Sequence, residues 1–307
     1  MTTKLSTVLV GTSLELSSDA VVRTGVELAR RAGAALHLFH AHALPLAYFA
    51  APSGFTTVDS DFLEAERQVR EQLLEQQLLR LGVQRSEVDG VTIEAGSVHR
   101  MLLETASELD ADLLVVGARE SERATQLGST TDRILRKTTC PVWVVDGRPR
   151  LPPERVLAPV DLSELSEDCL VQGVELLDRL GAETAALEAL FVLTPEELEG
   201  SHQFTPEQLR HLASDELATL RERTGLGDRL ATTVREGEIR NEIVHQLREE
   251  PIDLVVLGTH GRSGFERFLL GSVAADVAAR AGVSVLVVPP TAARAGHEET
   301  ESSEEAP

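Results

Sequence analysis

The chain contains few aromatic and few sulfur-containing residues. Its 307 residues include one Trp, one Tyr, two Met and two Cys. The two cysteines, Cys140 and Cys169, lie far apart and do not form a CxxC motif, so the sequence gives no support for a disulfide framework or a cysteine-based metal site. We expect both thiols to be reduced and buried.

Positive charge is also scarce. There are 29 Lys and Arg residues against 50 Asp and Glu, which gives a formal net charge of -21 at pH 7. Such a negative surface repels the phosphates of nucleic acids and the head groups of anionic lipids. We therefore expect neither a nucleic acid nor a membrane as a partner.

Long hydrophobic runs are absent as well. No apolar stretch approaches the roughly 20 residues that cross a bilayer. The first residues, MTTKLSTVLVG, pass into a strand-like segment without a signal-peptide pattern, so we expect a cytoplasmic protein. Hydrophobic residues make up 42% of the chain, which is ordinary for a globular protein, and the length suits two domains.

The sequence repeats itself with a period of about half its length. TVLVGTSLELSS at 7–18 aligns with RVLAPVDLSELS at 155–166, DADLLVVGARE at 110–120 with PIDLVVLGTHG at 251–261, and CPVWVV at 140–145 with VSVLVV at 283–288. The proline-rich segment 146–155 separates the copies, since it can continue neither a helix nor a central strand. We predict domains at 1–147 and 154–290.

Short runs rich in Val, Leu and Ala alternate with helical patterns in each copy. This alternation predicts βαβ units, hence an α/β fold with a parallel sheet and helices on both faces. Two leucine stripes at helical spacing predict helices that pack on that sheet; they are Leu73, Leu74, Leu78 and Leu81, and Leu209, Leu212, Leu217 and Leu220. Thr205-Pro206-Glu207-Gln208 is typical of a helix start. Residues 291–307 predict a disordered acidic tail.

A glycine-rich segment in the second copy points to an anion site. Gly258, Gly261 and Gly271, followed by Ser272, form the pattern G-x-x-G-x9-G-S between a predicted strand and a predicted helix. Glycines let backbone N–H groups approach an anion closely, and the start of a helix adds donors and partial positive charge. Such a loop is a candidate phosphate cradle, although a tight turn alone also requires glycine.

An acidic residue strengthens the case for a ligand. Asp161 follows the strand-like run VLAPV, where a carboxylate is placed to accept hydrogen bonds from ribose hydroxyls or an adenine amine. The alternative is that Asp161 caps the next helix. Ligands of doubly wound sheets bind beyond the carboxyl ends of the strands, so Asp161 and Gly258 would converge if their strands are neighbours.

Together, APVDLSELS and GTHGRSGFERFLLGS resemble the universal stress protein family, in its ATP-binding branch. The resemblance covers both halves of the chain. It implies two domains, each with five parallel strands in the order 3-2-1-4-5, that pair through their last strands as a pseudo-dimer, and it leaves pairing with a second chain open. It also implies one adenine nucleotide per chain, as ATP, ADP or AMP, with Mg²⁺ as a companion ion of ATP.

The resemblance also implies which residues surround the nucleotide. Carried over to matching positions, they are Pro159, Val160, Asp161 and Val192 at the nucleoside, and Gly258, Thr259, His260, Gly261, Arg262, Gly271, Ser272 and Val273 at the phosphates.

The first copy departs from this pattern. Ser13 replaces Asp161, Glu120 replaces Gly261, and the loop from Gly117 to Gly128 is two residues shorter than its counterpart. A carboxylate near phosphate oxygens opposes binding. We therefore expect a degenerate nucleotide site in the first domain, with a different ligand as the alternative.

The sequence shows no evident catalytic set. His260 lies in the glycine loop, but no nucleophile and orienting group accompany it. His40 and His42 share a face of the strand LHLFHAH and His37 lies on the other, which is too few convergent ligands for zinc. We predict a nucleotide-dependent regulatory stress protein; a slow Mg²⁺-dependent ATPase and a nucleotide-independent interaction module are the alternatives.

Overall fold

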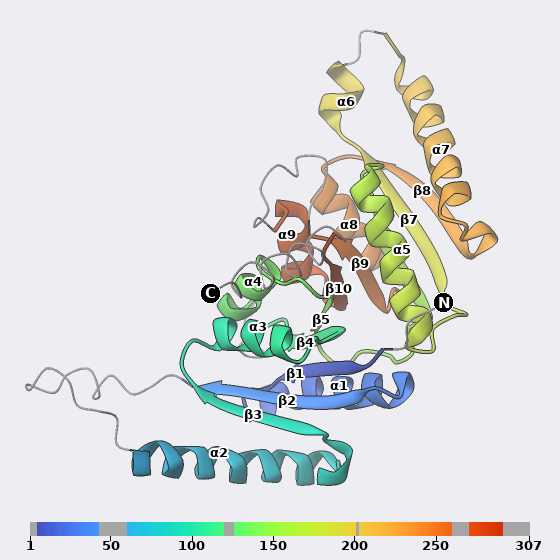
Figure 1. The fold of residues 1–307 in the computed structure, drawn as a ribbon. Coiled ribbons are helices and arrows are strands. Elements are labelled where there is room, and N and C mark those ends of the chain that lie inside the picture. Colours follow the sequence, from blue (N-terminus) through green and yellow to red (C-terminus); the bar gives the residue numbers. More distant parts are fainter. Residues whose placement is uncertain (1–4, 43–59, 120–125, 201–202, 260–269, 291–307) are drawn as a thin grey trace, which may run out of the picture.

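The computed structural model describes residues 5–42, 60–119, 126–200, 203–259 and 270–290. The strands of the described residues form a single ten-stranded sheet with the order β3-β2-β1-β4-β5-β10-β9-β6-β7-β8 (Figure 1). Neighbouring strands are parallel within each half, as expected for βαβ units. Each half therefore has the predicted order 3-2-1-4-5.

The elements of the two halves follow one another in the same sequence. The first half contains β1 (Thr7–Gly11), α1 (Asp19–Ala32), β2 (Ala35–His42), α2 (Ser60–Leu81), β3 (Gly90–Ala95), α3 (Val98–Glu108), β4 (Leu113–Gly117), α4 (Ser129–Leu135) and β5 (Val142–Val145). The second contains β6 (Arg155–Pro159), α5 (Glu164–Arg179), β7 (Ala186–Leu193), α6 (Pro195–Gly200), α7 (Pro206–Arg223), β8 (Leu230–Glu236), α8 (Ile239–Glu249), β9 (Leu254–Gly258), α9 (Ser272–Arg280) and β10 (Ser284–Val288).

The two halves meet through their last strands. β5 and β10 are antiparallel, with Val142, Trp143 and Val144 opposite Val287, Leu286 and Val285. This joint is the intramolecular domain pairing expected from the sequence. Because the joint is antiparallel, the carboxyl edge of the first half lies on the same side of the sheet as the amino edge of the second half.

Two hydrophobic layers cover the faces of the sheet, and each runs through both halves. One layer holds side chains of α1, α2, α5 and α7 against the sheet, and the other holds side chains of α3, α4, α8 and α9. Trp143 is fully buried at the joint and belongs to the first layer. The molecule is thus a three-layer α/β structure with helices on both faces, as predicted.

Several local predictions can be compared with the structure. Thr205 and Gln208 form the expected capping box at the start of α7. In the leucine stripes Leu74, Leu78, Leu217 and Leu220 are buried, whereas Leu73 and Leu212 face solvent because each stripe is wider than the face that the helix buries. Neither cysteine forms a disulfide, and both are buried. In the part of the chain that the structure describes, no helix is long and apolar enough to span a membrane.

Candidate functional site

The turns after β1 and β6 have the same backbone construction. Thr12 N–H donates to the Phe39 carbonyl and Val160 N–H to the Leu190 carbonyl, each at 2.9 Å. Two residues further on, Leu14 and Leu162 both adopt left-handed backbone angles, with φ of 65° and 61°. These matching turns confirm that Ser13 occupies the position of Asp161.

Asp161 stands in this turn beyond the end of β6 and at the start of α5. Its Oδ1 accepts hydrogen bonds from the Ser163 backbone N–H at 3.0 Å and from the Ser163 hydroxyl at 2.6 Å. Ser163 is the N-cap of α5 and accepts from the Ser166 N–H. The cap of α5 is thus Ser163, and Asp161 supports it through these two hydrogen bonds instead of capping the helix itself. The Asp161 side chain is half-buried at the carboxyl edge of the sheet.

The strand order brings the other nucleoside residues to this edge. β6 lies between β7 and β9, with Pro159 opposite Leu190 and Leu157 opposite Val255. Continuing the β6–β7 register places Asp161 level with Val192 on the neighbouring strand. Val160 and Val192 are buried and apolar, at 8% and 6% exposure, but they pack on opposite faces of the sheet. Val192 is therefore the apolar residue at the carboxyl end of the sheet on the face that α8 and α9 cover.

The glycine pattern lies on the other side of β6. β9 ends at Gly258, which pairs with Val288 of β10, and Thr259 follows it and is buried. Gly271 is the N-cap of α9, and its N–H donates to the Thr259 carbonyl at 2.7 Å. A Cβ at Gly271 would lie only 3.3 Å from that carbonyl oxygen, so the close approach of the two segments favours glycine.

Helix α9 begins directly at the predicted phosphate end. Ser272, its first residue, is exposed, and Val273 is half-buried. The first N–H groups of a helix have no partner within the helix and attract anions. The described residues thus place Asp161, Val192, Gly258 and the start of α9 at one edge of the sheet. His260, Gly261 and Arg262 lie outside the described residues.

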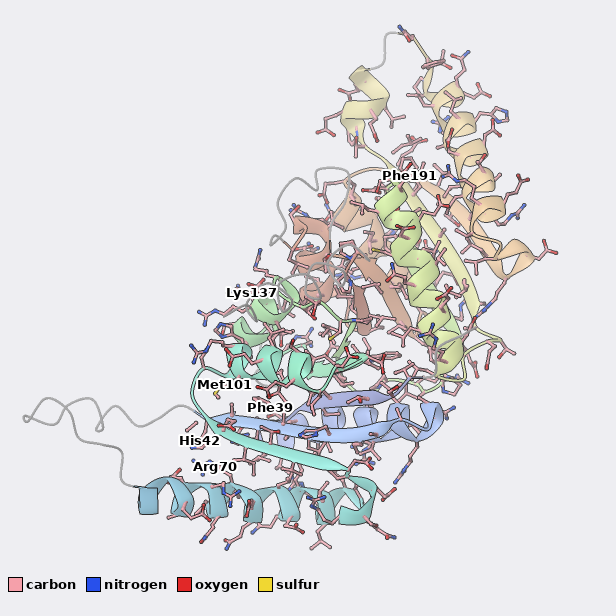
Figure 2. The ribbon with its side chains drawn as sticks, in the orientation of Figure 1. Phe39, His42, Arg70, Met101, Lys137 and Phe191 are labelled. Carbon is pink, nitrogen blue, oxygen red and sulfur yellow. The ribbon has the colours of Figure 1, made fainter. Side chains whose placement is uncertain are left out.

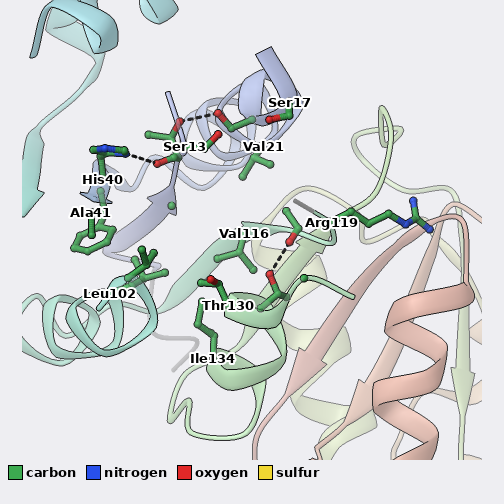
Figure 3. A pocket seen from close by; sticks show the side chains of 18 residues that line it. Ser13, Ser17, Val21, His40, Ala41, Leu102, Val116, Arg119, Thr130 and Ile134 are labelled. Atoms are coloured by element: carbon green, nitrogen blue, oxygen red, sulfur yellow. Dashed lines mark hydrogen bonds between the residues drawn. The ribbon is translucent and has the colours of Figure 1, made fainter. Parts of the chain in front are cut away.

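The first half has a hollow at the corresponding place, which we call the first cleft (Figure 3). It has a volume of about 360 Å³. Its apolar lining comes from Val21, Leu102, Val116 and Ile134, and its polar lining includes Thr12, Ser13, Ser17, Ser18, His40, Arg119, Thr130 and Thr131. Ser13 leaves this cleft without the carboxylate that Asp161 supplies in the second half, and Glu120 lies outside the described residues.

A buried polar network behind the first cleft was not anticipated from the sequence. The Gln77 side chain of α2 is fully buried, accepts a hydrogen bond from the Thr12 hydroxyl at 2.9 Å and donates to Ser18 and Asp19 at 3.1 and 3.0 Å. His40 Nδ1 lies 2.9 Å from the Thr12 carbonyl, which can only accept, so Nδ1 carries the proton.

The second half has apolar residues at the matching places of this network. Val160 corresponds to Thr12, and Phe191 to His40 through the equal starts of β2 and β7. Leu220 corresponds to Gln77 when α2 and α7 are aligned on their terminal glycines, Gly82 and Gly225, which have φ of 68° and 67°. The repeat alignment contained this signal, because Thr12 already stands opposite Val160.

The surroundings of the histidines of β2 disfavour their charged form. Burial lowers the pKa of His40, and the same cause lowers the pKa values of His37 and His42. The rings of His40 and His42 stack with centroids 5.9 Å apart. Within the described ranges no group of three or more His, Cys, Asp and Glu is arranged to hold a metal ion.

The fold and the site define a class of protein: a tandem, doubly wound α/β protein with a cleft beyond the strand ends of its first half and the matching strand ends in its second half. The sequence model of the universal stress protein family matches residues 4–146 and again 153–289. The chain therefore belongs to the universal stress protein family, with two family domains in tandem.

Individual relatives agree with this assignment. A universal stress protein of Mycolicibacterium smegmatis is 30% identical over 298 residues, which cover 92% of this chain and 97% of the relative. The crystal structure of a putative universal stress protein from Pseudomonas aeruginosa covers 97% of this chain and 98% of its own, at 19% identity and a TM-score of 0.63.

Proposed function

We propose that this universal stress protein binds one adenine nucleotide, ATP, ADP or AMP, in the cleft of its second domain and acts as a nucleotide-dependent regulator. The observation that carries the proposal is the meeting of Asp161, Val192 and the N-terminus of α9 at one edge of the sheet. An acidic acceptor, an apolar wall and an anion-attracting helix end are the three parts that a nucleotide requires.

Each part has a defined task in this proposal. The Asp161 carboxylate accepts hydrogen bonds from the ribose hydroxyls, Pro159 and Val160 border the nucleoside, and Val192 lines the adenine pocket. The backbone N–H groups at the start of α9 and the Ser272 hydroxyl donate to the phosphates. Mg²⁺ would be held mainly by the phosphates themselves, since the described residues offer no metal-ligating cluster.

Regulation is favoured over catalysis by the chemistry of the residues described at this edge of the second half. It offers a wall, an acceptor and donors, but the residues described there include no nucleophile paired with a base. A bound nucleotide would connect β6 and β7 to α9 and so stabilise the folded state by linkage. The expected cytoplasmic location stays a prediction from the sequence.

Substituting Asp161 tests the proposal. Asp161→Ser copies the residue of the first domain and keeps a hydroxyl that can accept from the Ser163 N–H. We expect the Kd for ATP, measured by isothermal titration calorimetry, to rise by about 10- to 100-fold, because a charged hydrogen-bond acceptor is lost. The stoichiometry of the wild-type chain should be one.

Ser13→Ala is the matched control in the first domain. It changes the equivalent position and should leave the Kd for ATP and the stoichiometry unchanged. If the wild-type chain shows neither a heat of binding nor a rise in melting temperature with millimolar ATP, the proposed function is wrong. That result would support the alternative of a nucleotide-independent interaction module.

A further inference from the structure

We infer that Arg119 of the first domain is a positioning residue for the nucleotide site of the second domain, because it holds the far end of helix α9. The inference rests on the proposed function, since the near end of the same helix, at Ser272, is assigned to the phosphates. It gives the first domain a role in ligand binding even if its own cleft takes no nucleotide.

Helix α9 extends from the carboxyl edge of the second half to the carboxyl edge of the first half. Its nine residues span about 14 Å. The N-terminus lies at the carboxyl edge of the second half, and the antiparallel β5–β10 joint brings the C-terminus to the carboxyl edge of the first half. There Arg119 Nη2 donates to the Ala279 carbonyl at 3.4 Å.

The guanidinium is fixed by a second contact. Arg119 Nη1 donates to Asp146 Oδ1 at 2.6 Å, and the Asp146 backbone N–H donates to the Ser284 hydroxyl at 3.2 Å. We call Arg119, Asp146, Ser284 and Ala279 the brace. It joins the end of β4, the end of β5, the start of β10 and the end of α9, so it crosses the domain joint twice.

The brace occupies a place where a charge has a strong effect. The last carbonyl groups of a helix lack partners and carry partial negative charge, which a guanidinium offsets. The side chains of Arg119 and Asp146 are only 23% and 12% exposed. Arg119 Nε and Asp146 Oδ2 are buried and have no hydrogen-bond partner among the described residues, so removing either residue leaves the other as an incompletely paired charge.

At the matching positions, the sequence of the second half lacks the residue types that form the brace. The repeat alignment places His260 opposite Arg119 and Pro289 opposite Asp146. Proline has no side-chain acceptor and is buried here, so the second half cannot form the same ion pair. The contact therefore runs from the domain with the degenerate site to the helix of the domain with the intact pattern.

Arg119 also lines the first cleft, from which its side chain extends toward the second half (Figure 3). The Arg119 side chain therefore contacts both the first cleft and helix α9. Tilting α9 by releasing its C-terminal end displaces the N–H groups and the hydroxyl at its N-terminus, because a short helix moves as a unit.

The test compares full-length variants by ATP titration calorimetry and by hydrogen exchange of α9 without nucleotide. Arg119→Met keeps the length and removes the charge and all donors. We expect its Kd for ATP to rise about 5- to 30-fold and the amides of residues 272–280 to exchange several-fold faster. Arg119→Lys keeps the charge but cannot reach both partners with two separate nitrogens, so its values should lie between those of the wild type and Arg119→Met.

Arg80→Met is the matched control. It removes a partly buried Arg–Asp pair, Arg80–Asp19, in the same domain but away from the joint. Its Kd and its α9 exchange should stay within twofold of wild type. All titrations are run well below the melting temperature of the least stable variant. A change in Kd then reports a displaced α9 and not unfolding of the protein.

The outcomes separate the inference from the proposed function. Wild-type binding of ATP together with an unchanged Kd in folded Arg119→Met overturns the inference alone. If the wild-type chain binds no ATP, the proposed function fails; α9 exchange then decides whether the brace exists, with faster exchange in Arg119→Met supporting it and unchanged exchange refuting it.

Discussion

At the scale of single residues, Asp161 combines two roles. Its Oδ1 orders the first turn of α5 through Ser163, and the same carboxylate lies at the edge where a nucleoside would bind. At the matching position Ser13 keeps only a weak local contact, with the Glu15 N–H 3.4 Å from its hydroxyl. One change of residue type thus replaces a charged acceptor at this position with a neutral hydroxyl.

Cys169 illustrates how burial controls the chemistry of one residue. Its thiol donates to the Val288 carbonyl, and burial, with Asp168 and Asp161 nearby, raises its pKa to about 12. The thiolate is therefore suppressed across the physiological range, and the thiolate is the reactive form.

We predict that the folded protein resists thiol labelling at pH 8. Labelling with a disulfide reagent should proceed at least a hundredfold more slowly in the native chain than in guanidinium chloride, where both cysteines react. A Cys140→Ala variant isolates Cys169 and should show the same protection. Rapid labelling of that variant under native conditions would contradict the assigned burial.

At the scale of elements, the sequence predicted those features that depend on residues close together in the chain. The capping box of α7 and the start of α9 at Ser272 involve residues within a few positions of each other. The strand order came instead from the family resemblance. Only with that order are Asp161 and Gly258 expected to lie on neighbouring strands.

The contacts that the sequence did not predict join distant elements. Gln77 of α2 reaches Thr12 across 65 positions, and Arg119 reaches Ala279 across 160. Periodicity describes which face of a helix is buried, but it does not say which polar partner a buried glutamine meets. The identity of the partner depends on how two elements are placed in space.

Strand β2 should make stability depend on pH. Burial lowers the pKa values of His37, His40 and His42 in the folded state, whereas the unfolded chain protonates near the ordinary 6.5. Figure 2 labels His42 and Arg70 of α2, whose positive charge also lowers the pKa of His42. Between the lower folded pKa values and about 6.5 the unfolded state binds more protons, so stability is complete above that window and is lost as the pH falls through it.

We expect the free energy of unfolding to fall between pH 7.5 and 5.5, by at most about 1.4 kcal/mol per pH unit for each histidine. His40→Phe, which introduces the residue type of Phe191, should give a shallower slope in urea titrations across this range. His211→Gln changes an exposed histidine and serves as the control. Equal slopes in wild type and His40→Phe would argue against a buried, neutral His40.

At the scale of the whole molecule, the β5–β10 joint turns two five-stranded sheets into one. Trp143 is fully buried there and stands opposite Leu286. Because it is the single tryptophan of the chain, its fluorescence reports on the joint alone.

Removing this side chain should weaken the entire fold. Trp143→Ala is expected to lower the free energy of unfolding by about 3–5 kcal/mol, as is usual for deletion of a large buried aromatic group. Urea unfolding followed by far-ultraviolet circular dichroism measures the loss. Val91→Ala on the edge strand β3, where the side chain is only half-buried, should cost clearly less. A loss below about 1 kcal/mol in Trp143→Ala would show that the joint contributes little.

The same joint bears on how the protein behaves at different abundances. Two separate polypeptides that met through β5 and β10 would separate on dilution, whereas residues 146–154 keep these two domains on one chain. Tethering by a short segment sets an effective concentration on the order of millimolar, whatever the number of molecules in the cell. A cell that makes a few copies and a cell that makes many would therefore contain the same paired form, and the pairing strands are no longer open to another copy.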